Sequence, residues 1–214
     1  MLHRNLIDSI AQITRSTMVD QGAGHGWDHI ERVRRHALTL HEHEGGDDAL
    51  IEIASLLHDV GDAKFNNGVE KSGLLTREIL SEYDIPSSFI ERVVHIVDNL
   101  SFRKRDSAEP LSLEGKIVQD ADRLDALGAI GIIRTVEYGQ FKSQPFFDPN
   151  HPSSPSGVMH FHEKLFKLQK LMNTVTAKRI AEDRVQFMQC FLKQYFQEID
   201  ATEPAWLADD GRQK

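Results

Sequence analysis

The sequence predicts an all-α fold, and two observations support this prediction. Apolar residues recur at intervals of three and four positions along nearly the whole chain, which is the period of a helix with one buried face. No segment combines the alternation of a strand with the turn residues of a hairpin. The chain has 214 residues, of which 40% are hydrophobic and 27% charged. It can therefore bury a sizeable core, and we expect one domain over residues 1–214.

The first two helices are indicated by apolar stripes that end at glycines. The first stripe comprises Leu6, Ile7, Ile10 and Ile13, and the helix stops before the segment 22–24. The second comprises Ile30, Val33, Ala37 and Leu40, which predicts a helix over about 28–43 that Gly45 and Gly46 end.

The third helix is predicted over about 47–59. Asp47 and Asp48 stand at its start, where the helix dipole favours negative charge. The same periodicity predicts further helices over about 70–83, 87–99, 112–124 and 126–138, and a long helical pair over about 158–198.

The segment 143–157 interrupts this pattern, because it holds four of the seven prolines. It could be a linker. Both flanks, however, look like parts of one helical core, so we expect a loop folded over the site or a mobile lid. In this interpretation the core covers about 22–140, and the helices of 158–198 pack on it.

Charge and composition exclude several classes of function. The net charge of −8 argues against binding of DNA or RNA polymers, which requires clustered Lys and Arg, whereas a local basic pocket for a small phosphorylated ligand is compatible with it. The N-terminus lacks the apolar core of a secretory signal, and no stretch has the roughly 18 apolar residues of a membrane span. We expect a cytoplasmic protein without a membrane partner; nothing indicates its oligomeric state. The single cysteine, Cys190, is expected to be a packed core thiol.

The pair His58-Asp59 is the most informative feature of the chain. It ends the apolar run 49–57, and neither side chain belongs there unless it is paired. A cation is one of the few partners that could satisfy both. His29 borders the apolar stripe of its helix, and Asp122 lies at the edge of a buried face, so both could reach the same cation. Two imidazoles with two carboxylates suit a borderline to hard divalent ion.

The ordered set His29, His58-Asp59 and Asp122 resembles the signature of the HD-domain superfamily of metal-dependent phosphohydrolases. The segments 25–33, 58–65, 120–131 and 160–165 together are similar to a bacterial subgroup of small, stand-alone HD hydrolases. The resemblance implies an HD-domain-like helical bundle and the four residues as metal ligands. It implies hydrolysis of a phosphate ester or anhydride, with a nucleotide as the expected substrate. We expect one divalent ion, with Mn²⁺ first and Mg²⁺, Fe²⁺, Co²⁺, Ni²⁺ or Zn²⁺ as alternatives.

Hydrolysis by a metal-activated water needs a general base and fixed cations. Asp59 could accept the proton with its second oxygen, and Asp62 is the alternative base. Lys64 follows the ligand helix in a loop and is expected to stabilise phosphoryl charge. Five residues are candidates for substrate binding: His25, Arg32, Arg123, His162 and Lys164. For Arg32 and Arg123 a surface pairing with Glu31 or Asp125 is equally compatible with the sequence.

Two other functions stay open on the same scaffold. A di-iron oxygenase would need further ligands between Asp59 and Asp122, and His95 has no convincing partner there, so we favour one metal ion and expect His95 to be buried and hydrogen-bonded. A regulatory module would retain the metal and sense a nucleotide. The stand-alone chain, in which no attached sensory or DNA-binding domain is recognised, favours an enzyme.

Overall fold

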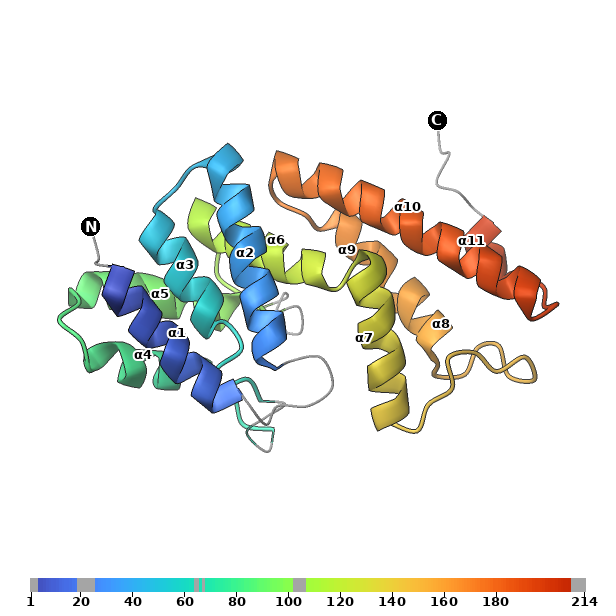
Figure 1. The fold of residues 1–214 in the computed structure, drawn as a ribbon, viewed down its shortest axis with the longest axis horizontal. Coiled ribbons are helices and arrows are strands. Elements are labelled where there is room, and N and C mark those ends of the chain that lie inside the picture. Colours follow the sequence, from blue (N-terminus) through green and yellow to red (C-terminus); the bar gives the residue numbers. More distant parts are fainter. Residues whose placement is uncertain (1–3, 19–25, 64–65, 67, 102–106, 209–214) are drawn as a thin grey trace. The chain divides into compact units, whose positions relative to one another are not determined.

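The computed structural model describes residues 4–18, 26–63, 66, 68–101 and 107–208. Within these residues all regular structure is helical, which confirms the all-α prediction (Figure 1). The helices are α1 (Arg4–Met18), α2 (Trp27–Glu44), α3 (Asp48–Leu57), α4 (Ser72–Ser81), α5 (Ser87–Asn99), α6 (Leu113–Asp125), α7 (Gly128–Phe141), α8 (Gly157–His160), the π-helix η2 (Phe161–Leu165), α9 (Phe166–Lys170), α10 (Val175–Glu198) and α11 (Ala205–Ala208).

The chain forms two compact units. The first contains residues 1–122 and 173–177, and the second contains 123–172 and 178–214. Helices α6 and α10 each contribute residues to both units. The expectation of one domain, with the C-terminal helices packed on the core, stays a prediction.

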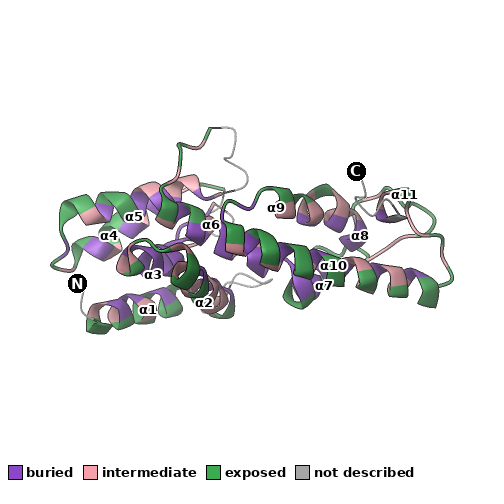
Figure 2. Cartoon of the chain, turned by 90° about the horizontal axis from the view of Figure 1, so that it is seen from above, coloured by how far each residue is buried: buried purple, intermediate pink, exposed green. Residues whose placement is uncertain are grey.

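The core of the first unit is built around α3. Residues 50–57 of this helix are all buried, and α1, α2 and α5 pack against it. Asp47 begins the helix, since its side chain accepts a hydrogen bond of 3.2 Å from the Leu50 amide. The surrounding helices are amphipathic: buried and exposed residues lie on different sides of α1, as Figure 2 shows.

A buried carboxylate ties the first three helices together. Glu52 of α3 accepts hydrogen bonds of 2.9 Å from Arg4 of α1 and from Nε of Arg34 of α2. The Glu52 side chain is only 5% exposed, so its charge requires these partners. The contacts fix α2 against α3, the two helices that carry the histidines of the candidate site.

The proline-rich segment 143–157 is a loop within the second unit, and not a linker between the units. Its base is closed by backbone hydrogen bonds from Gly157 to Pro145 (3.1 Å) and from Val158 to Phe146 (2.9 Å). The Phe146 ring packs edge-on against Tyr195 of α10, with ring centroids 5.0 Å apart. These contacts anchor the two ends of the loop; a role as a lid stays a prediction.

Two expectations about single residues are wrong. Cys190 is exposed on α10 rather than packed in the core, because the buried Met188 and Leu192 lie two residues before and after it, on the opposite face of the helix. His95 is hydrogen-bonded, with Nε2 3.1 Å from the Pro110 carbonyl, but its side chain is 37% exposed rather than buried. Among the described residues, no helix combines the length and apolar composition that a bilayer crossing requires.

Candidate metal centre

His58 lies at the C-terminal end of α3 with its imidazole fixed by the backbone. Its Nδ1 lies 2.7 Å from the Ser55 carbonyl oxygen, and its side chain is 3% exposed. Because a carbonyl only accepts hydrogen bonds, Nδ1 carries the proton. Nε2 therefore presents a lone pair on the opposite side of the ring, which is the form that binds a metal.

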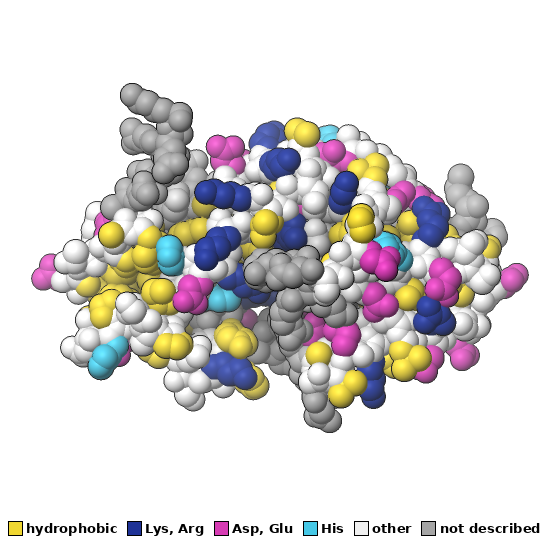
Figure 3. Space-filling view, turned by 180° about the vertical axis from the view of Figure 1, so that it is seen from behind, with side chains coloured by type: hydrophobic (Ala, Val, Ile, Leu, Met, Phe, Trp, Pro, Cys, Tyr) yellow, Lys and Arg dark blue, Asp and Glu magenta, His cyan; other side chains and the backbone are white. Residues whose placement is uncertain are grey.

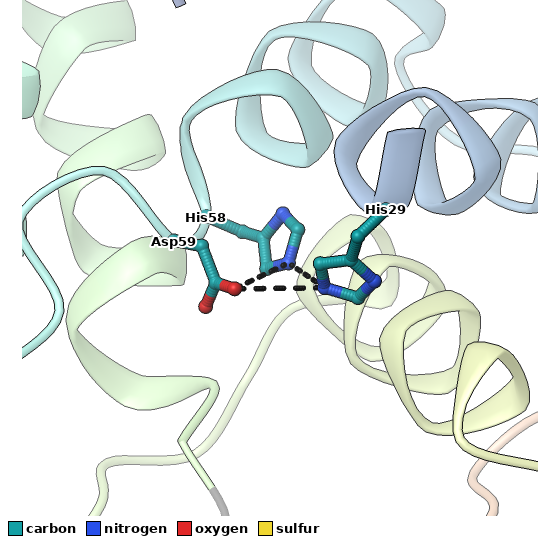
Figure 4. A group of neighbouring side chains, drawn as sticks. All are labelled: His29, His58 and Asp59. Carbon is teal, nitrogen blue, oxygen red and sulfur yellow. Dashed lines mark hydrogen bonds and ion pairs between the residues drawn. The ribbon is translucent and has the colours of Figure 1, made fainter. Parts of the chain in front are cut away.

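His29 faces this lone pair from the first turn of α2. Its amide donates a hydrogen bond of 3.0 Å to the Gly26 carbonyl, and its side chain is 1% exposed. The Nε2 atoms of His29 and His58 are 3.3 Å apart, and the two rings meet at an angle of 68° (Figure 4). Two buried ring nitrogens thus point at one region of space.

Asp59 adds a carboxylate oxygen from the turn that follows α3. Its Oδ2 lies 3.5 Å from His29 Nε2 and 3.9 Å from His58 Nε2. The turn continues at Gly61 with φ +87°, a conformation that favours glycine. A Cβ at Gly61 would come within 2.8 Å of the Lys71 backbone, so the sequence Asp59-Val60-Gly61 is fixed by a close approach of two chain segments.

Asp122 completes the group from α6. Its Oδ1 lies 3.5 Å from His29 Nε2 and 3.9 Å from His58 Nε2. Unlike the two imidazoles, its side chain is 42% exposed. The four predicted ligands, which are separated by up to 93 positions in sequence, therefore meet in the first unit, and Asp122 is the most exposed of them.

The donor atoms fit a divalent cation. Atoms bound about 2.1 Å from one ion are about 3.0 Å apart at right angles and about 3.4 Å apart at the tetrahedral angle. The separations between an imidazole nitrogen and another donor atom are 3.3, 3.5 and 3.9 Å. His29, His58 and Asp59 also satisfy a general criterion for a metal-binding group, because their donor atoms all lie within 4.8 Å of one another. Two nitrogens and two carboxylate oxygens form a donor set for a borderline to hard ion.

Four other predicted site residues lie in the first part of the chain, and the structure describes two of them, Asp62 and Arg32. His25 and Lys64 lie outside the described residues. Asp62 is 8% exposed and its amide donates a 3.2 Å hydrogen bond to the Asp59 carbonyl, so it lies in the same turn as a ligand. Arg32 is half-buried three residues after His29, which places it on the same side of α2. Their roles in catalysis and substrate binding stay predictions.

Three further candidates for substrate binding belong to the second unit. Arg123 donates a hydrogen bond to the Leu171 carbonyl. His162 of η2 stacks on Trp206, with ring centroids 4.7 Å apart and an interplanar angle of 26°, and it lines a cavity of about 540 Å³. Lys164 lies in the same π-helix. These local contacts do not connect the three residues to the metal centre, and their binding roles stay predictions.

Sequence reasoning missed two residues near the site. Ser55 sets the tautomer of His58 through its backbone carbonyl, for which a sequence carries no signal. Asp120 is 0% exposed and accepts hydrogen bonds from Asn173 and Thr174. A signal for Asp120 existed, because it falls on the buried stripe of α6 between Ile117 and Leu124, where a carboxylate needs partners.

Comparisons with known proteins show the family to which the chain is related. The HD domain model matches residues 26–127, which include all four candidate ligands. The uncharacterized protein YpgQ of Bacillus subtilis is 37% identical over 194 residues, which cover 90% of this chain and 93% of that protein.

Solved structures show the same fold over nearly the whole chain. The crystal structure of Bacillus subtilis YpgQ in complex with ADP has a TM-score of 0.77 and 34% identity, covering 91% of this chain and 95% of that chain. That of an HD-superfamily hydrolase from Bacillus thuringiensis has a TM-score of 0.77 and 40% identity, covering 93% and 99%. The chain therefore belongs to the HD-domain family, as the order of its histidines and aspartates predicts.

Proposed function

We propose that the protein is a metal-dependent phosphohydrolase that cleaves a phosphate ester or anhydride bond of a nucleotide with a metal-activated water. The observation that carries the proposal is the convergence of His29, His58, Asp59 and Asp122: the two imidazole nitrogens lie 3.3 Å apart, and each lies 3.5 to 3.9 Å from an oxygen of both carboxylates. Similarity to an HD-superfamily hydrolase supports hydrolysis, and the complex of the related YpgQ with ADP supports a nucleotide as substrate.

The candidate ligands differ in burial: some are held rigidly in the core, and one is accessible to solvent. His29 and His58 are buried, and the Ser55 carbonyl holds the imidazole of His58 in the tautomer that offers Nε2. Asp122 is partly exposed, so water and a phosphorylated substrate can approach on its side. When bound, a divalent cation would polarise a phosphoryl oxygen and lower the pKa of a bound water. We propose one ion, with Mn²⁺ as the first candidate because of the mixed nitrogen and oxygen donors.

The chain also supplies candidates for proton transfer and charge stabilisation. Oδ2 of Asp59 faces the two imidazoles, and we propose that the same carboxylate accepts a proton from the attacking water. Asp62, in the same turn, is the alternative base. Negative charge on the phosphoryl group requires fixed cations, for which Lys64, Arg32 and Arg123 are the candidates. His25, His162 and Lys164 complete the proposed substrate contacts.

Acidic and basic side chains share the face seen in Figure 3, and the net charge is −8. This balance supports a small phosphorylated substrate and no DNA or RNA polymer, because polymer binding depends on many Lys and Arg contacts to phosphates.

The decisive experiment combines metal analysis with a substrate panel. The purified protein is assayed for bound metals, and release of phosphate and of pyrophosphate is measured over a panel of nucleotides with each divalent cation. We expect turnover of at least one nucleotide with Mn²⁺, and none with the variant His58→Ala. Metal and nucleotide binding without any turnover would favour a regulatory module, and absence of metal binding would overturn the proposal.

A further inference from the structure

Asp120 holds one turn of α6 against a distant segment of the chain. Its Oδ1 accepts hydrogen bonds from the Asn173 amide (2.9 Å) and from Asn173 Nδ2 (2.8 Å). Its Oδ2 accepts from the Thr174 amide (2.8 Å) and the Thr174 hydroxyl (2.9 Å). The side chain is completely buried, so the segment 173–174 satisfies a carboxylate that water cannot reach.

Asn173 and Thr174 begin the segment 173–177, which belongs to the first unit although the residues before and after it belong to the second. It contains the start of α10, where unpaired amides and the helix dipole favour a carboxylate. Thr174 also accepts a hydrogen bond of 3.3 Å from the Ala177 amide. A second carboxylate, Glu44 at the end of α2, accepts a hydrogen bond of 2.8 Å from the Thr176 amide.

Asp120 stands two residues before the candidate ligand Asp122 on the same helix. The side chain of Asp122 is 42% exposed, so few neighbours surround it, and the backbone of α6 determines where its carboxylate lies. A functional group must be held within about 0.5 Å of its working position. The hydrogen bonds of Asp120 fix the turn of α6 from which Asp122 reaches toward His29.

We propose that Asp120 is a positioning residue for the metal centre: by binding Asn173 and Thr174, it sets the place of the Asp122 carboxylate. The inference rests on the proposed metal site, but not on the hydrolysis of a nucleotide. It adds the segment 173–174, which contains none of the four candidate ligands, to the residues on which metal affinity depends.

The variant Asp120→Asn tests this inference with almost no change in side-chain volume. Each oxygen of Asp120 accepts a backbone amide, Oδ1 from Asn173 and Oδ2 from Thr174. The NH₂ group of an asparagine would face an N–H donor in either orientation, and the turn of α6 must move to relieve this. We expect the Kd for Mn²⁺ to rise about 10- to 100-fold, the scale for residues that orient ligands.

The matched control is Glu44→Ala, which removes the other carboxylate contact to the same segment. Glu44 lies about 22 Å along α2 from His29, at 1.5 Å per residue. This variant should lose some stability and keep the wild-type Kd for Mn²⁺. The Kd values are measured by titration calorimetry and by electron paramagnetic resonance of free Mn²⁺, well below the melting transition of each variant, so that a loss of stability alone does not change them.

The outcomes distinguish a failure of the proposed role of Asp120 from a failure of the metal site or of the hydrolase proposal. A folded Asp120→Asn protein with wild-type Kd would overturn the inference, and so would an equal loss of affinity in Glu44→Ala. If Asp120→Asn does not fold, Thr174→Val is the second variant, because it removes the hydroxyl that donates to Oδ2 of Asp120 and keeps the shape of the Thr174 side chain. A wild-type Kd for Mn²⁺ in Thr174→Val would also overturn the inference. A wild-type protein that binds no Mn²⁺ refutes the proposed metal site and this inference together. One that binds Mn²⁺ but cleaves no nucleotide refutes only the hydrolase proposal.

Discussion

The substitution Asp122→Ala separates metal binding from folding. The Asp122 side chain is 42% exposed, so its removal leaves no buried cavity, and we expect the stability of the metal-free protein to change by no more than about 0.5 kcal/mol. The two imidazoles, by contrast, are 1% and 3% exposed, and their removal would disturb the core as well as the site. Asp122 is therefore the ligand whose loss is easiest to interpret.

The expected size of the effect follows from ligand linkage. Mn²⁺ at 100 times the wild-type Kd stabilises the wild-type protein by about 2.7 kcal/mol. Residues that only orient ligands change metal affinity by about 10- to 100-fold, so loss of a direct ligand should cost about 100-fold or more. At the same Mn²⁺ concentration the variant would then gain no more than about 0.4 kcal/mol. The difference of about 2.3 kcal/mol corresponds to about 5–9 °C in Tm for a chain of this size.

The assay is a thermal melt followed by circular dichroism, with and without Mn²⁺, for the wild type and Asp122→Ala. The control is Glu91→Ala, which removes a carboxylate from the exposed Arg77–Glu91 pair of the same unit. Glu91→Ala should keep the full Mn²⁺-dependent rise in Tm. If Asp122→Ala keeps it too, Asp122 is not a ligand and the reasoning from the four converging donor atoms is refuted.

Three further predictions concern catalysis, metal choice and pH. Lys64→Ala should keep full metal occupancy and Tm while kcat falls on the order of 10²-fold, with partial recovery in Lys64→Arg; a near wild-type kcat would show that Lys64 does not contact the substrate. Chelation should abolish turnover, and Mn²⁺ should restore it better than Ca²⁺, which prefers oxygen ligands at longer distances; equal rescue by Ca²⁺ would argue against histidine ligands. Burial lowers the pKa of His160 below its usual 6.5, so the folded protein takes up this proton at lower pH than the unfolded chain. His160 therefore destabilises the fold as pH falls below about 6.5, and His160→Gln should lose less Tm than the wild type between pH 7.5 and 5.5; parallel Tm curves would contradict this.

The helices could be predicted because their apolar residues follow a single period. Helix α5 covers Ser87–Asn99, the predicted range, and α2, α3, α4, α6 and α7 begin and end within a few residues of their predicted bounds. The pair predicted over about 158–198 is divided differently, because α8, η2 and α9 precede the long α10. The π-helix η2 could not be predicted, because its hydrogen bonds skip one more residue than those of an α-helix and leave no distinct composition. The short α11 has too few residues for a period.

The candidate ligands stand out in the sequence for a similar reason. His29 and His58 stand at apolar positions, where an unpartnered imidazole would be costly, and the structure shows both to be buried with their Nε2 atoms facing each other. Asp120 also stands at a buried position, but its partners lie more than 50 residues away in the chain. A sequence pattern shows that such a carboxylate needs a partner and does not show which one.

The division between buried and exposed ligands gives the site its chemical character. Both imidazoles are buried, and a backbone carbonyl holds that of His58, so in the proposed site they would define the geometry of the bound ion when a substrate arrives. A site made only of such groups would be closed to substrate, because a structural metal site uses all its positions for protein ligands. Asp122 is the ligand that faces solvent, and its own position depends on α6, which Asp120 anchors from the buried side. In the proposed site, access for a phosphorylated substrate and the precise placement of the candidate ligand Asp122 would therefore come from opposite sides of one helical turn.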